Sequence, residues 1–182
     1  MTVGADAGRA PRVVLIGPMG VGKSTVGRLL AERLGVAFLD GDDVVVEREG
    51  REISDIFIDE GERYFRDVEC RTTLELLGGH GGVLALGGGA PTQPPIATAL
   101  AGLPVVFLDV GIADAAKRIG FDTSRPLLAV NPRATWVRMM NGRRPVYESL
   151  ARWRVDTAGR APAEVVDEIL GLLEPAEGVC RE

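Results

Sequence analysis

Residues 17–25 read Gly-Pro-Met-Gly-Val-Gly-Lys-Ser-Thr, the Gly-x4-Gly-Lys-Ser/Thr spacing of a loop that binds nucleoside phosphates. Glycines let backbone N–H groups converge on phosphate oxygens, and the following helix adds partial positive charge at its N-terminus. Lys23 can reach between phosphates, and the hydroxyl of Ser24 can bind Mg²⁺. Apart from Lys117, every other basic residue of Lys/Arg type is arginine, so a lysine at this position is informative. The loop therefore predicts a nucleoside-triphosphate site.

Acidic residues follow the next expected strand, as Asp40-Gly41-Asp42-Asp43. Carboxylates beside a triphosphate can serve Mg²⁺, which often keeps water between itself and the protein, or accept a hydrogen bond from a substrate hydroxyl. The alternative is a helix N-terminus capped by acids, and Asp43 fits that better. For Asp40 and Asp42 together we favour a functional role.

Three glycines, Gly87, Gly88 and Gly89, follow a third apolar run. Consecutive glycines cost chain entropy, and close approach of backbone N–H groups to a ligand would compensate. A plain turn is the alternative, and the position at the end of a strand favours the ligand.

A helix predicted over 61–77 places Glu62, Arg66 and Glu69 on one face. Asp59 and Glu62 have the spacing of an N-terminal capping pair, and Gly78-Gly79 would end the helix. A solvated row of ion pairs explains this face as well as a binding role does, so Arg66 remains undecided from this pattern alone.

A polar, glycine-hinged segment at 119–131 carries Arg125 before Pro126. Beside a phosphate site, such a segment predicts a closing lid whose arginine stabilises charge on the transferred phosphoryl group. An ordinary surface loop is the alternative.

The elements that must position these residues alternate between strand and helix. Strands are expected near 12–16, 36–39, 83–86, 104–109 and 152–156, and helices near 23–34, 61–77, 92–101, 113–119, 133–149 and 162–173, with shorter turns between 43 and 58. Continuously apolar strands favour a parallel sheet covered on both faces, so the fold class is a doubly wound α/β domain. Its ligands would lie at the carboxyl ends of the strands, where the phosphate loop, the acids and the glycines fall.

Length and composition fit one globular domain over 12–173, with a flexible leader at 1–11 and a tail at 174–182. The net charge of −5 argues against nucleic acid as a partner, and no apolar stretch is long enough for a membrane span. Two distant cysteines, Cys70 and Cys180, favour a cytoplasmic protein without a disulfide framework, and the solitary His80 fits a loop position better than a metal site. We expect a monomer.

As a set, these residues resemble the shikimate kinase family over about residues 12–173. The resemblance rests on residues 17–25, 39–42, 56–57, 61–62, 65–66, 86–90, 125–128 and 155–157, together with Arg143, Pro145 and Tyr147. It implies a P-loop three-layer α/β/α fold with a five-stranded parallel sheet in the order 2-3-1-4-5, a mobile lid at about 119–131 and a substrate-binding helical segment at about 43–78. It also implies ATP- and Mg²⁺-dependent phosphorylation of the 3-hydroxyl of shikimate, in aromatic amino-acid biosynthesis.

The resemblance carries roles to matching positions. Lys23, Asp42 and Arg125 would be catalytic, and Ser24 and Asp40 would serve the metal. Shikimate would be bound by Asp42, Arg66, Gly87, Gly88, Gly89 and Arg143, and ATP by Gly20, Val21, Gly22, Lys23, Ser24, Thr25, Arg118, Arg125, Arg160 and Pro162. Val46 departs from the glutamate often found there in the family, which affects a supporting contact.

Two other functions fit part of the pattern. A gluconate kinase would share the loop and the fold, but it leaves the combination of Asp42, Arg66, Arg143 and the glycines unexplained. A nucleotide-binding regulator without transferase activity would not need this complete catalytic set.

Overall fold

The computed structural model describes residues 9–119 and 131–174. Residues 1–8 of the expected leader, 120–130 of the expected lid (Arg125 among them) and 175–182 of the expected tail lie outside this range. The described elements are β1 Val13–Ile16, α1 Lys23–Leu34, β2 Phe38–Asp40, α2 Gly41–Glu49, α3 Ile53–Asp59, α4 Gly61–Gly79, β3 Val83–Ala85, the 3₁₀ turn η1 Ala90–Thr92, α5 Pro94–Leu100, β4 Val105–Asp109, α6 Ile112–Ile119, α7 Pro132–Leu150, β5 Trp153–Asp156 and α8 Pro162–Leu173.

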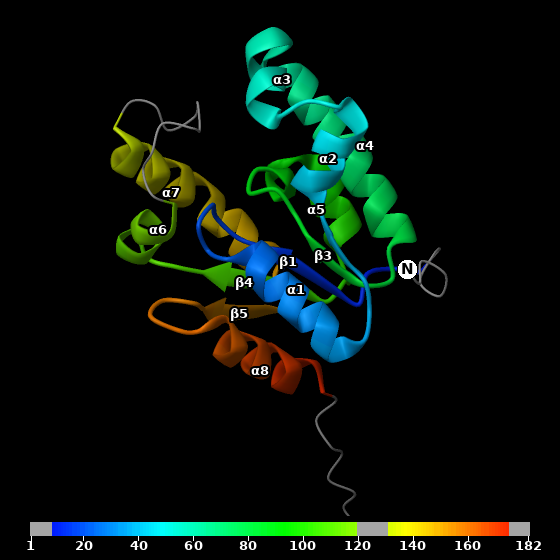
Figure 1. The fold of residues 1–182 in the computed structure, drawn as a ribbon, viewed down its shortest axis with the longest axis vertical. Helices are drawn as coiled ribbons and strands as arrows, with labels where there is room; N and C mark the ends of the chain where they lie inside the picture. The colour runs from blue at the N-terminus through cyan, green and yellow to red at the C-terminus, as the bar shows by residue number, and fades with distance from the viewer. Residues whose placement is uncertain (1–8, 120–130, 175–182) are drawn as a thin grey trace, which may run out of the picture.

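A five-stranded parallel sheet forms the centre of the molecule, in the order β2-β3-β1-β4-β5 (Figure 1). In the central register Val14 of β1 lies beside Leu84 of β3 and Val105 of β4. All residues of β1, β3 and β4 are buried, as expected for parallel strands covered on both faces. The predicted fold class and strand order are confirmed.

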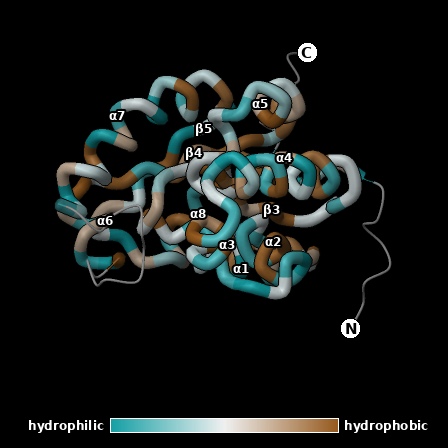
Figure 2. Tube along the Cα trace, turned by 90° about the horizontal axis from the view of Figure 1, so that it is seen from above, coloured by the Kyte–Doolittle hydropathy of each residue, from teal (hydrophilic) through white to brown (hydrophobic). Residues whose placement is uncertain are grey.

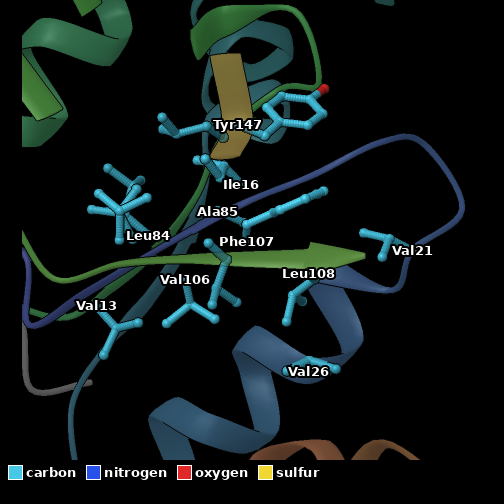
Figure 3. Close-up of a cluster of buried hydrophobic side chains, with 14 of the residues drawn as sticks. Val13, Ile16, Val21, Val26, Leu84, Ala85, Val106, Phe107, Leu108 and Tyr147 are labelled. Atoms are coloured by element: carbon cyan, nitrogen blue, oxygen red, sulfur yellow. The ribbon is translucent and has the colours of Figure 1, made fainter. Parts of the chain in front are cut away.

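Helices cover both faces of this sheet. Helices α1 and α8 pack against each other on one face, and α4, α5 and α7 lie on the other, with the strands between the two layers (Figure 2). The buried side chains on the face toward α7 include Phe107 of β4 and Tyr147 of α7, whose ring centroids are 5.2 Å apart (Figure 3). Because all five strands run the same way, their carboxyl ends meet at one edge, where the candidate residues gather.

The segment between β2 and α4 differs from the sequence-based expectation of short turns. It forms two helices, α2 and α3. Helix α2 begins because the Asp40 carboxylate accepts a hydrogen bond from the Asp42 N–H at 3.0 Å, and Gly50 ends it in the left-handed conformation with φ of 68°. The helix cap that the acidic residues offered as an alternative is therefore present, and Asp42 and Asp43 lie in the first turn of α2.

The predicted start of α4 at residue 61 is confirmed, but its predicted capping pair and its predicted end are wrong. Asp59 is the last residue of α3, and its carboxylate accepts from Arg51 at 3.4 Å instead of capping α4. Helix α4 continues through Gly78 and Gly79 to a cap at His80. His80 lies in the connection between α4 and β3, as expected, and it is buried there with Nε2 3.1 Å from the Val83 carbonyl oxygen.

Candidate functional site

The phosphate loop joins β1 to α1 with a backbone that only glycine adopts readily. Gly20 and Gly22 have φ of 81° and 94°, and a side chain at Gly17 would collide with the Leu108 carbonyl oxygen of β4. No side chain caps α1 at Gly22, and no acidic residue occupies its first turn. The first N–H groups of α1 therefore point into the loop as an anion site.

Lys23 folds back over this loop. Its Nζ donates to the carbonyl oxygens of Gly17 at 2.9 Å and Pro18 at 3.1 Å. The ammonium is thereby held at the concave side of the loop, where a lysine can reach the phosphates of a nucleotide.

Neighbouring elements brace the loop from outside. The indole of Trp136 in α7 donates to the Met19 carbonyl oxygen at 3.1 Å, and Ile119 at the end of α6 packs against Gly20. Arg118 donates to the Val21 carbonyl oxygen at 3.1 Å. The conformation of the loop thus depends on α6 and α7 as well as on its own glycines.

Three of the residues expected to bind ATP, Arg118, Arg160 and Pro162, lie near the segment that follows β5. Arg118 also donates to the Thr157 carbonyl oxygen at 2.6 Å, while Arg160 donates to that of Asp156 at 3.0 Å. Pro162 is the first residue of α8. The structure therefore brings the side chain of Arg118, from α6, to the segment that carries the other two residues, beside the phosphate loop.

Asp40 connects the phosphate loop to α2. Its Oδ2 accepts the Ser24 hydroxyl at 2.6 Å, while its Oδ1 caps α2 through the Asp42 N–H. Both roles considered for Asp40 from the sequence, acid beside the phosphates and helix cap, are thus compatible. Within residues 9–119 and 131–174 no three His, Cys, Asp or Glu side chains cluster as a metal site. Mg²⁺ fits the oxygen donors Ser24 and Asp40 only if phosphate and water complete its shell, as that ion prefers.

The three glycines after β3 give room to side chains. A Cβ on Gly87 would lie 2.5 Å from Asp42 Oδ1 and 2.7 Å from Glu69 Oε1, and one on Gly88 would lie 3.2 Å from Arg143 Nη1. A Cβ on Gly89 would collide with the guanidinium of Arg66. Each glycine therefore faces a different charged group, a reason for the triplet that the sequence did not suggest.

The same turn lies against the phosphate loop. The Cβ position of Gly88 is 3.5 Å from the Gly17 carbonyl oxygen, and the Gly88 carbonyl oxygen accepts the Tyr147 hydroxyl at 2.5 Å. Asp42, Arg66 and Arg143 are thus gathered beside the phosphate loop, although they come from α2, α4 and α7.

Arg66 has one exposed and one buried acidic partner. It contacts Glu62 at 3.3 Å and Glu69 at 2.7 Å, and the side chains of Glu62 and Glu69 are 63% and 4% exposed. Burial opposes the charge on Arg66, but the Glu69 carboxylate raises its pKa above the ordinary value. A solvated ion-pair row describes Glu62 but not Glu69.

Glu69 and Tyr147 are buried polar groups of this site. The sequence patterns include both residues but assign neither a role in the site. Burial raises the pKa of Glu69 even though Arg66, Arg143 and the Gln93 amide favour its ionised form. Burial also raises the pKa of Tyr147, against the effect of Arg143. The available signal was spacing, since Glu69 is three residues after Arg66 and Tyr147 four after Arg143 on their helices.

Comparisons with known proteins agree with this geometry. A family model described as shikimate kinase matches residues 19–174. The chain is 54% identical over 167 residues to a shikimate kinase of Streptomyces avermitilis, covering 92% of this chain and 98% of that one. It superposes on a shikimate kinase from Acinetobacter baumannii in complex with shikimate with a TM-score of 0.86 and 39% identity, over 91% and 94% of the two chains.

A gluconokinase from Sinorhizobium meliloti is a more distant structural neighbour. Its TM-score is 0.59 at 23% identity, over 91% of this chain and 93% of that one. This likeness extends to the fold alone.

Proposed function

Because the chain belongs to the shikimate kinase family and phosphorylates shikimate with ATP, we propose that Asp42, Arg66 and Arg143 form the pocket for this acceptor. The observation that carries the assignment is the glycine turn at 87–89. It admits one of these three side chains at each position, directly beside the phosphate loop.

Shikimate carries one carboxylate and three hydroxyls, and the pocket offers a matching set of groups. The guanidinium groups of Arg66 and Arg143 can hold the carboxylate through charge-assisted hydrogen bonds. The Asp42 carboxylate can accept from ring hydroxyls and orient the 3-hydroxyl toward the γ-phosphate. Gly87, Gly88 and Gly89 line the same pocket.

Transfer of a phosphoryl group depends mainly on in-line placement and on neutralisation of charge. Residues 20–25 hold the phosphates, and Lys23 supplies positive charge at the concave side of the loop. Ser24 and Asp40 would hold Mg²⁺, which when bound neutralises phosphate charge. Arg125, outside the described residues, would add a further cation from the lid. In this scheme Asp42 contributes by orienting the 3-hydroxyl of shikimate, and the scheme does not require it to remove the proton.

Arg118, Arg160 and Pro162 complete the proposed ATP site. Their side chains meet at the segment after β5, close to Val21, which supports a place for the adenine at this end of the loop.

Four expectations remain predictions from the sequence: a single domain over 12–173, a monomeric state, a cytoplasmic location and the absence of a nucleic-acid partner. No helix of the described residues has the length and apolar character needed to cross a membrane.

The direct test is coupled detection of ADP release with ATP, Mg²⁺ and shikimate, against reactions without shikimate or with gluconate in its place. We expect release that depends on shikimate and is lost by orders of magnitude in Asp42→Asn. Robust turnover of gluconate alone would favour the competing sugar-acid kinase. ATP binding without transfer to either acid would favour a regulator.

A further inference from the structure

Asp109 is a buried carboxylate at the carboxyl end of β4, outside the acceptor pocket. It is 5% exposed, and four donors surround it. Arg144 donates to Oδ2 at 2.7 Å and to Oδ1 at 2.9 Å, which makes a bidentate ion pair. Arg154 of β5 donates to Oδ2 at 2.6 Å, and the Val110 N–H donates to Oδ1 at 2.8 Å. Burial opposes ionisation, yet these donors hold the pKa of Asp109 below its ordinary value.

Arg144 is the neighbour of Arg143 in α7. Successive residues of an α-helix point about 100° apart, so the two arginines leave the helix in different directions. Arg143 lies against Gly88, and Arg144 reaches Asp109 and also lies 5.8 Å from the centre of the Phe107 ring. One arginine thus faces the acceptor pocket while the next contacts the sheet.

A second attachment fixes the same stretch of α7 to the glycine turn. Tyr147, one turn after Arg143, is fully buried and donates to the Gly88 carbonyl oxygen. Between the two attachments lies Pro145, which has no N–H and leaves α7 without one of its internal hydrogen bonds. The missing hydrogen bond lies close to Arg143, whose side chain must have a defined direction. Contacts between α7 and the rest of the protein must therefore fix that direction.

We propose that Arg144 and Asp109 form a positioning pair that sets the direction of Arg143 toward the carboxylate of the acceptor. The inference rests on the proposed function, because it assumes that Arg143 binds that carboxylate. Without the bidentate ion pair between Arg144 and Asp109, α7 is held at this turn mainly by Tyr147 and can rotate about Pro145. Arg143 then reaches the carboxylate only in part of the population, whereas the phosphate loop keeps its own braces.

The test is steady-state kinetics with shikimate and ATP varied separately. We expect Arg144→Ala to raise the KM for shikimate about fivefold or more, with kcat and the KM for ATP within about twofold of wild type. Arg144→Lys should restore part of the loss because an ammonium can still contact one oxygen of Asp109. Arg154→Ala is the matched control, since it removes a donor from the same carboxylate but leaves the attachment of Arg144; its KM for shikimate should stay within about twofold.

A double variant identifies the route of the effect. In an Arg143→Ala background, Arg144→Ala should change the KM for shikimate little further, since the residue through which it acts is gone. Additive losses, an unchanged KM in Arg144→Ala, or equal losses in Arg154→Ala would each overturn the positioning role. Thermal unfolding identifies variants that do not fold; if Arg144→Ala is one of them, Arg144→Gln, which keeps most of the stem, takes its place.

The outcome is separable from that of the proposed function. If the wild-type protein does not use shikimate, or if Arg143→Ala binds it normally, the assignment of the pocket fails. If both behave as proposed and Arg144→Ala resembles wild type, only the positioning pair fails.

Discussion

Replacing Arg66 with alanine examines the acceptor pocket most directly. Its guanidinium lies against Gly89 and donates to the buried Glu69 at 2.7 Å, while Glu62 contacts it from the exposed side at 3.3 Å. The substitution removes a charged donor from the proposed carboxylate site. It also leaves the buried Glu69 without its short ion-pair partner.

The magnitude follows from these two effects. A hydrogen bond to a charged group contributes about 1.5–3 kcal/mol, and the Glu69 carboxylate, no longer neutralised by Arg66, adds repulsion toward an anionic acceptor. Together they predict a loss of about 2–4 kcal/mol in shikimate binding, or about 30- to 1,000-fold in affinity. Glu62→Ala is a matched control, because an exposed ion pair is worth at most about 1 kcal/mol and its loss should change affinity by no more than about fivefold.

Isothermal titration of shikimate into wild type, Arg66→Ala and Glu62→Ala gives the three affinities, and thermal unfolding verifies that each variant is folded. Wild-type affinity in Arg66→Ala would refute the place of Arg66 in the pocket. An equal loss of ATP affinity would show instead that the substitution disturbs the whole site.

Three further substitutions examine the remaining groups. Lys23→Ala should lower kcat by orders of magnitude while circular dichroism stays that of wild type, because the phosphates lose their cation; normal turnover would remove its role. Gly87→Ala places a methyl group 2.5 Å from Asp42 Oδ1, so kcat/KM for shikimate should fall about 10- to 100-fold with ATP affinity kept, and a normal value would mean that the carboxylates adapt freely. Burial raises the pKa of Glu69, so the buried carboxyl is neutral at low pH and does not destabilise the fold. As the pH rises toward that raised pKa, the cost of burying the ionised carboxylate lowers the stability of the wild-type protein. The melting temperature of Glu69→Gln relative to wild type should therefore increase as pH rises from the ordinary carboxyl pKa, and a difference independent of pH would contradict the assigned burial.

Most of the fold could be predicted because its determinants are local. The phosphate loop, the apolar strands and Gly35 as the end of α1, with φ of 65°, each follow from residues adjacent in the chain. The segment between β2 and α4 was less predictable. Its helices depend on a cap from Asp40 and on packing of Val45 and Ile56 against α4, in a short apolar cluster with Phe65. Such contacts are not visible in local periodicity.

The candidate site divides in the same way. Lys23, Asp42 and the glycine triplet fall at the ends of strands, so the sheet topology predicts their common edge. The reason for the glycines could not be predicted, because it requires knowing that Asp42, Arg66 and Arg143 come from three helices to one turn. Asp109 and Arg144 are 35 residues apart in the chain, so no local sequence pattern predicts their ion pair.

The arrangement also explains how a protein with a net charge of −5 can bind anionic molecules through arginines. In the proposed acceptor pocket, the buried Glu69 carboxylate accepts a hydrogen bond from the Arg66 guanidinium on the side of the protein interior. A guanidinium carries five donors in a planar fork, so one edge can bind a fixed carboxylate while another remains directed outward; a lysine ammonium does this poorly. Glu69 reduces the positive potential of the pocket, but it restricts the Arg66 side chain and so reduces the entropy lost when an anion binds. At the phosphate loop the requirement is different, since a single point charge must reach between phosphates, and there the chain has Lys23.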